Sequence, residues 1–157
     1  MSPTAPEPGD PLYLDKARPD VFAAMSGVAR AIGAAAMEAG VSELLLELVN
    51  LRVSQVNGCA YCLDVHHKKA LRLGEDPRRL AVLQEWQETD IFSDVESAAL
   101  ELAESITRIP VPAERGATEE VARQVLGDDA YAVIAWAAIS MNAFNRISIT
   151  SHHPVRP

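Results

Sequence analysis

A chain of 157 residues with 48% hydrophobic and 23% charged residues has the composition of one soluble globular domain. Its formal net charge of −8 argues against nucleic acid and anionic membranes as partners, because those contacts need clusters of Lys and Arg that the sequence lacks. Since the first residues have neither the basic nor the apolar segment of a secretory signal, we expect a flexible tail over residues 1–17, a single domain over residues 18–157 and a cytoplasmic location.

Helical periodicity accounts for the first half of the chain. Pro19 suits the first turn of a helix whose apolar residues recur at i, i+3 and i+4, and Gly40 can end it. A second helix is expected to start at the Ser42 cap and to stop at the turn dipeptide Asn-Gly of residues 57–58. A third helix is predicted over about residues 59–73.

Capping residues mark four further helices in the second half. Asp76 precedes a short helix that reaches Trp86, and Ser93 opens a capping box before a strongly amphipathic helix. Thr118 is expected to cap another short helix, and Asp128 a long last helix that ends near residue 149.

An apolar run over residues 130–139 lies inside this last helix. The run is about half of the ~20 residues that a membrane-spanning helix needs, so we expect a buried core helix and no membrane contact. No segment shows the sustained period-two alternation of a strand. The sequence therefore predicts an all-α fold, a compact bundle of six to seven helices.

The chain has only two cysteines, in the sequence Cys59-Ala-Tyr-Cys62. His66 follows four residues later, so at about 3.6 residues per turn the three side chains project from one helix face. In the first turn of the predicted helix, the sulfurs would lie near unpaired N–H groups and the positive end of the helix dipole, which favour the reactive thiolate. This spacing indicates redox chemistry, with a histidine able to accept a proton.

Two other interpretations of the cysteines stay open. They can be buried thiols that only pack in the core. They can also form half of a zinc site that is completed by His66, His152 or His153, although structural zinc usually takes four ligands from two separated half-sites and only one half-site is clear here.

Glu47 lies in the preceding helix, where it forms a polar stripe with Glu43, Asn50 and Ser54. Such a stripe commonly faces water. The functional alternative places the Glu47 carboxylate in a partly dry setting, where it accepts protons from the dithiol through His66. Sequence spacing alone leaves both possibilities open.

The spacing of four residues resembles the E-x11-C-x2-C-x3-H signature of the alkylhydroperoxidase D-like (AhpD-like) family, within the carboxymuconolactone decarboxylase superfamily: Glu47, Cys59, Cys62 and His66. Residues 51–75 (LRVSQVNGCAYCLDVHHKKALRLGE) look like the core helix pair of that family, and residues 141–147 (MNAFNRI) look like its closing helix. One position departs from the best-known pattern, because Tyr61 stands where those members have a histidine before the second cysteine.

The resemblance implies an AhpD-like subunit that forms homotrimers or homohexamers and acts as a thiol-dependent alkyl hydroperoxide reductase. Cys62 would attack the hydroperoxide and become a sulfenic acid, and Cys59 would resolve it to a Cys59–Cys62 disulfide. Glu47 and His66 would form the proton relay. A lipoyl-protein or thioredoxin-like dithiol would reopen the disulfide, without a cofactor or a metal.

Two rival functions remain at this stage. One is a redox sensor, in which disulfide formation alters the oligomeric state or partner binding without sustained turnover. The other is the lactone decarboxylation found elsewhere in the superfamily, which does not rely on a redox cysteine pair, so the presence of both sulfurs argues against it.

Overall fold

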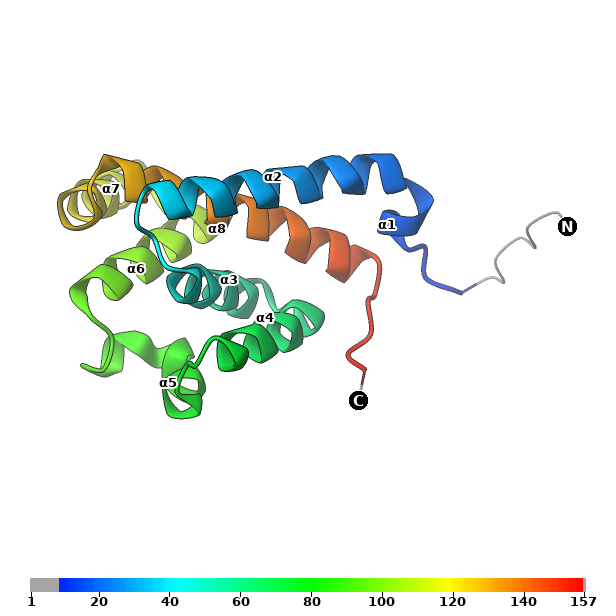
Figure 1. Cartoon of the computed structure of the whole chain (residues 1–157), viewed down its shortest axis with the longest axis horizontal. Helices are drawn as coiled ribbons and strands as arrows, with labels where there is room; N and C mark the ends of the chain where they lie inside the picture. The colour runs from blue at the N-terminus through cyan, green and yellow to red at the C-terminus, as the bar shows by residue number, and fades with distance from the viewer. Residues whose placement is uncertain (1–8, 157) are drawn as a thin grey trace, which may run out of the picture.

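The structure is a computed structural model that describes residues 9–156, and over this range it has eight α-helices, one 3-10 helix and no strand (Figure 1). The elements are α1 (Leu14–Ala17), α2 (Pro19–Glu38), α3 (Glu43–Asn57), α4 (Ala60–Arg72), α5 (Pro77–Val82), η1 (Leu83–Glu88), α6 (Asp94–Arg108), α7 (Pro112–Leu126) and α8 (Asp128–Thr150). The predicted all-α fold is confirmed. The one α-helix beyond the predicted set is α1, a single turn within the region expected to be a tail, whose residues 1–8 lie outside the described range.

Three of the predicted caps are present. The Ser42 hydroxyl accepts a hydrogen bond from the Leu45 amide, and the Asp76 carboxylate accepts one from the Arg78 amide. Ser93 and Glu96 form the complete capping box at the start of α6. These side chains satisfy N–H groups that have no partner inside the helix, which is why short-range sequence located these helix starts correctly.

Two predicted helix starts are wrong. Helix α7 begins at Pro112, so Thr118 lies inside it and caps nothing. Proline has no N–H and a φ already near the helical value, and both properties suit the first position of a helix. Asp128 is the first residue of α8 and not its cap, because Gly127 takes the N-cap position with a φ of 78° and no side-chain hydrogen bond.

Helix α3 lies at the centre of the molecule, between α8 on one side and α4 and α6 on the others (Figure 1). Its apolar side chains divide between two buried clusters, one shared with α8 and one shared with α5 and with η1, which supplies Trp86. Helix α8 supplies Val133, Ile134, Ala137 and Ala138 to the first cluster, so the predicted core helix over residues 130–139 is confirmed.

A second buried feature of α3 is its ion pair with α6. Glu104 accepts hydrogen bonds from Arg52 Nε at 2.6 Å and from Trp86 Nε1 at 2.8 Å, and Arg108 binds its other oxygen. Burial alone would raise the pKa of Glu104, but these donors hold it below its ordinary value. The network fastens η1 and α6 to α3.

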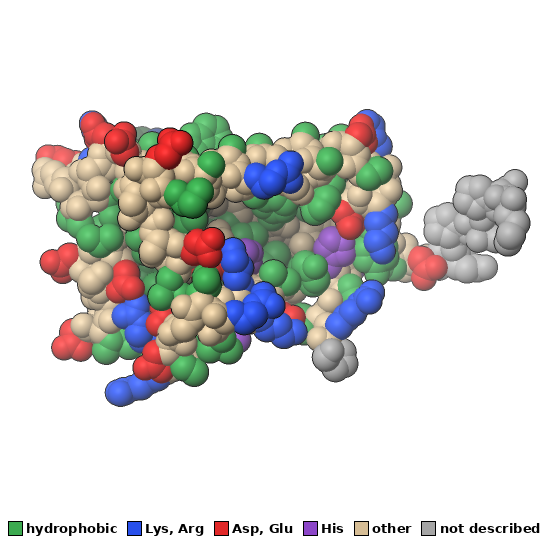
Figure 2. Space-filling view, viewed as in Figure 1, with side chains coloured by type: hydrophobic (Ala, Val, Ile, Leu, Met, Phe, Trp, Pro, Cys, Tyr) green, Lys and Arg blue, Asp and Glu red, His purple; other side chains and the backbone are tan. Residues whose placement is uncertain are grey.

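Helix α2 covers the core from outside, and of its 20 residues only Ala36 is buried. Figure 2 shows hydrophobic side chains along this helix at the surface. By length and composition α2 and α8 are both apolar enough to cross a membrane. These two properties are weak evidence for a span, because a buried core helix such as α8 has them as well.

Candidate functional site

The site is built at the corner between α3 and α4. Gly58 ends α3 in the left-handed conformation, with a φ of 70°, which suits glycine because it has no Cβ. Cys59 follows as the N-cap of α4, so the helix begins at Ala60, one residue later than predicted. The Cys59 sulfur accepts a hydrogen bond from the backbone N–H of Cys62 at 3.3 Å.

Cys59 and Cys62 are joined in a disulfide, with their Cα atoms 5.3 Å apart. This separation lies within the usual range for a disulfide. Both residues are nearly inaccessible, at 1% and 4% exposure. The predicted convergence of the two sulfurs at the positive end of α4 is therefore present, but a reagent as large as a dithiol cannot reach them without local opening of this turn.

Glu47 and His66 meet across the α3–α4 interface. His66 Nδ1 lies 2.6 Å from Glu47 Oε2, and Glu47 is only 1% exposed. The interpretation of Glu47 as part of a stripe that faces water is therefore wrong. Glu43 at the start of the same stripe is exposed, whereas Ser54 at its far end is buried, because α4 and α8 cover the later turns of α3.

Lys69 is a member of this cluster that the sequence reasoning missed. Its Nζ lies 2.8 Å from Glu47 Oε1, so each carboxylate oxygen has its own partner from α4. The signal was present, because Lys69 is three residues after His66 and residues at that spacing share a helix face. Burial alone would raise the pKa of Glu47, but hydrogen bonds and charges from His66 and Lys69 lower it below its ordinary value.

A chain of amides ties the cysteine turn to α8. Asn57, the last residue of α3, donates to the side-chain oxygens of Asn142 and Asn145 at 2.9 and 3.0 Å. The fully buried Asn145 donates in turn to the Ser54 hydroxyl at 3.0 Å, and Ser54 donates to the Asn50 carbonyl. The segment over residues 141–147, singled out by its resemblance, thus braces the turn that precedes Cys59.

Tyr61, between the two cysteines, is packed against the C-terminal segment. Its ring lies 5.1 Å from that of His153, which stacks on Tyr13 and contacts Asp15 and Ser148 through its two nitrogens. His153 is one of the three histidines considered as a zinc ligand, with His66 and His152, and both of its ring nitrogens are engaged in these contacts. Within residues 9–156, no group of three or more His, Cys, Asp and Glu side chains is arranged to hold a metal ion.

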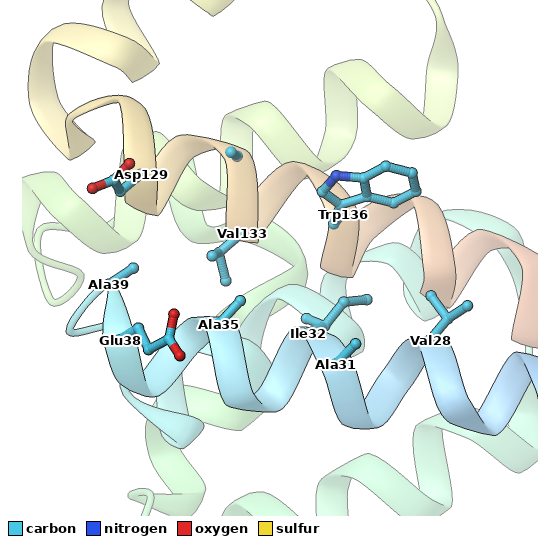
Figure 3. A pocket seen from close by; sticks show the side chains of 10 residues that line it. Val28, Ala31, Ile32, Ala35, Glu38, Ala39, Asp129, Val133 and Trp136 are labelled. Atoms are coloured by element: carbon cyan, nitrogen blue, oxygen red, sulfur yellow. The ribbon is translucent and has the colours of Figure 1, made fainter.

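An apolar groove lies elsewhere, between α2 and α8 (Figure 3). Its volume is about 620 Å³, and its lining is apolar apart from Glu38 and Asp129 at one end. Trp136 lies on its rim and is 58% exposed. None of the four predicted site residues lines this groove.

Comparison with known sequences places the site in a family context. The sequence profile of the Carboxymuconolactone decarboxylase family matches residues 19–105. The uncharacterized protein YdfG of Bacillus subtilis (strain 168) is 37% identical over 112 residues, which cover 71% of this chain and 76% of that protein. The uncharacterized protein YnjA of Escherichia coli (strain K12) is 39% identical over 64 residues, 40% of this chain and 35% of that protein.

Two solved structures share the fold. A protein of unknown function from Agrobacterium tumefaciens, described as a candidate antioxidant defence protein AhpD, superposes with a TM-score of 0.83 at 26% identity, covering 94% of this chain and 99% of that one. An uncharacterized peroxidase-related protein from Silicibacter sp. TM1040 gives a TM-score of 0.63 at 25% identity, covering 78% of this chain and 67% of that one.

Proposed function

Because the chain belongs to the carboxymuconolactone decarboxylase family, as an AhpD-like member, we propose that it is a thiol-dependent alkyl hydroperoxide reductase. The observation that carries the proposal is the hydrogen bond between the buried Glu47 and His66, a residue that follows Cys62 by four positions on α4, the helix that begins at the cysteine pair. A nucleophile, a base and a group that orients the base are the parts that an activated thiol requires.

In the proposed reaction, His66 takes the proton of the Cys62 thiol in the reduced protein. The Cys62 thiolate attacks one peroxide oxygen, so that an S–O bond forms, the O–O bond breaks, and the alcohol leaves after receiving a proton. Cys62 is then a sulfenic acid. The Cys59 thiol attacks this sulfur, water leaves, and the disulfide is restored. One hydroperoxide is reduced by two electrons from the two thiols.

An external dithiol of the lipoyl-protein or thioredoxin-like kind is proposed to reopen the disulfide by thiol–disulfide exchange. Because the sulfurs are 1% and 4% exposed, this step requires the first turn of α4 to open. Hydroperoxide turnover should therefore depend on the size of the reductant, and a small dithiol should react faster than one carried on a rigid domain.

The test is turnover of cumene hydroperoxide by the reduced protein with dihydrolipoamide in excess. Cys62→Ser is the control variant, since serine is nearly isosteric with cysteine but cannot be oxidised. Sustained turnover that is abolished in Cys62→Ser, with an unchanged circular dichroism spectrum, supports the proposal. Equal turnover in the variant contradicts the assignment of Cys62.

A second candidate is a thiol–disulfide switch without sustained turnover, and the burial of both sulfurs favours it. The same assay separates the two candidates. A switch consumes one equivalent of hydroperoxide per subunit and stops with Cys59 and Cys62 bridged, even when the dithiol remains in excess.

We also propose that the chain self-associates, as a homotrimer or homohexamer, through the apolar face of α2 and α8. What supports this is the single buried residue of α2 and the exposed Trp136, since tryptophan is enriched at the centres of interfaces. Light scattering should give a multiple of the subunit mass that Trp136→Asp reduces. Val95→Asp, which changes an exposed residue outside this face, should not reduce it.

A further inference from the structure

The carboxylate of Glu47 is held from two directions by one helix. Its Oε2 is 2.6 Å from His66 Nδ1, and its Oε1 is 2.8 Å from Lys69 Nζ. The Glu47 side chain is only 2% exposed, whereas that of Lys69 is 46% exposed. Lys69 therefore brings a charge from the surface to an oxygen that water does not reach.

We infer that Lys69 is a positioning residue for the proposed proton relay, which fixes the Glu47 carboxylate in its ionised form and turns Oε2 toward His66. The inference deepens the proposed function, and it rests on that function only where the relay is said to serve the cysteines. Nothing in the sequence signature or in the family resemblance assigns a role to this position.

The first support is that each carboxylate oxygen of Glu47 has one hydrogen-bond partner. Without Lys69, Oε1 would have no donor among the described residues, and a buried acceptor without a donor is destabilised by its lost contact with water. The carboxylate would then gain by turning, or by taking up a proton. Either change would weaken the hydrogen bond that sets the orientation of the His66 ring.

The second support is that, within residues 9–156, the charged partners of Glu47 come from α4 alone. They are His66 and Lys69, and both lower the pKa of Glu47 against the effect of burial. Helices α6 and α8 and the 3-10 helix η1 also pack against α3, but Glu104 of α6 is paired with Arg52 and Arg108, and α8 approaches α3 with uncharged amides. Among the described residues, Lys69 is thus the one cation of fixed charge paired with Glu47.

The position of Glu47 determines which ring nitrogen of His66 carries the proton. An ionised Glu47 accepts from N–H at His66 Nδ1, which leaves Nε2 as the basic nitrogen, and Nε2 has no hydrogen-bond partner within residues 9–156. A carboxylate held in this orientation therefore keeps Nε2 free to accept the thiol proton in the proposed reaction.

The experiment follows the ring nitrogens and the Nδ1 proton of His66 by NMR in the oxidised protein at pH 7, where the cysteines are bridged. The parent protein should show the Nδ1 proton in a hydrogen bond to the Glu47 carboxylate, and Lys69→Met should weaken or abolish this signal because the carboxylate is no longer held. Lys68→Met is the matched control, because Lys68 neighbours Lys69 in sequence and pairs with Asp64 on the helix surface, and it should leave the signal unchanged. Lys69→Arg should restore the signal of the parent protein.

Turnover gives a second readout in the reduced protein. At pH 7 Lys69→Met should be roughly three- to tenfold slower than the parent protein, and Lys69→Arg should recover most of the rate. If the Nδ1 signal of Lys69→Met matches that of Lys68→Met, the inference is overturned whatever the activity. If the signal is lost but no variant turns over hydroperoxide, the proposed function fails and the role of Lys69 in holding the pair stands. Lys69→Gln repeats the test should the methionine variant not fold.

Discussion

Two buried glutamates, Glu47 of α3 and Glu104 of α6, are similar in burial and in the direction of their pKa shift, but their hydrogen-bond partners differ. They are 1% and 7% exposed, and in both the donors that surround the carboxylate overcome the effect of burial and lower its pKa. Glu104 is bound by Arg52, Arg108 and Trp86, none of which gives up a proton near neutral pH. Glu47 is bound by His66 and Lys69.

The difference shows that a buried carboxylate is not by itself a sign of catalysis. The Glu104 network can only hold three elements together, since all its partners keep their protons. The Glu47 network contains the imidazole of His66, which can both accept and donate a proton, and His66 follows Cys62 by four residues on α4. What distinguishes a candidate site from a structural ion pair is thus the chemistry of the donors.

Among variants of the two glutamates, we expect the largest effect in Glu47→Gln, where hydroperoxide turnover should fall. Proton transfer by a positioned base contributes about 10²–10⁴-fold, so we expect turnover to fall at least about 100-fold at pH 7. The remaining rate should follow the unassisted ionisation of Cys62 and move to higher pH. Stopped-flow measurement of sulfenic acid formation from pH 5 to 10 checks this, and an unchanged profile would remove Glu47 from the relay.

Glu104→Gln should have the opposite signature. It leaves Arg52, whose side chain is 8% exposed, without its anion, and breaking a buried ion pair costs about 3–5 kcal/mol. We expect the free energy of unfolding in urea to fall by about 3 kcal/mol. Turnover of the folded protein should stay within about twofold of the parent. A large loss of turnover with little loss of stability would reverse the roles of the two glutamates.

Much of the fold could be predicted because its signals are local. A cap such as Ser42 or Asp76 acts within three residues of itself, and the Asn-Gly turn acts through the conformation of Gly58 alone. The prediction of the start of α7 was wrong for the same reason. Thr118 and Pro112 are both local signals for a helix start, and the sequence does not show which of the two is stronger.

In the candidate site, too, the features within one helix could be predicted and those that depend on helix packing could not. The spacing of Cys59, Cys62 and His66 is a property of one helix and was sufficient to group them. The burial of Glu47 depends on how α4 and α8 pack over α3, and no periodicity within α3 contains that information. The spacing of the polar stripe left open whether it faces water, and only the packing of the neighbouring helices decides that Glu47 and Ser54 are buried while Glu43 is exposed.

Acid should weaken both networks. A carboxylate whose pKa is lower in the folded than in the unfolded protein stabilises the fold above the unfolded value of about 4.3, and this stability is lost as the pH falls through the folded value. The difference in unfolding free energy between the parent and Glu104→Gln should therefore shrink below about pH 4. Urea titrations at pH 7, 5, 4 and 3 measure it, and a constant difference would contradict the assigned ion pairs.

The smallest effect is expected at the surface, where the same residue types form a pair without burial. Lys68 and Asp64 are 2.9 Å apart on α4, and the side chain of Lys68 is 56% exposed. Water screens such a pair, so Lys68→Met should change the free energy of unfolding by no more than about 0.5 kcal/mol. Lys69, one residue further, should differ from it only because its partner is buried. Thermal unfolding of the two variants side by side measures that difference, and equal effects would mean that burial of Glu47 does not strengthen its contact with Lys69.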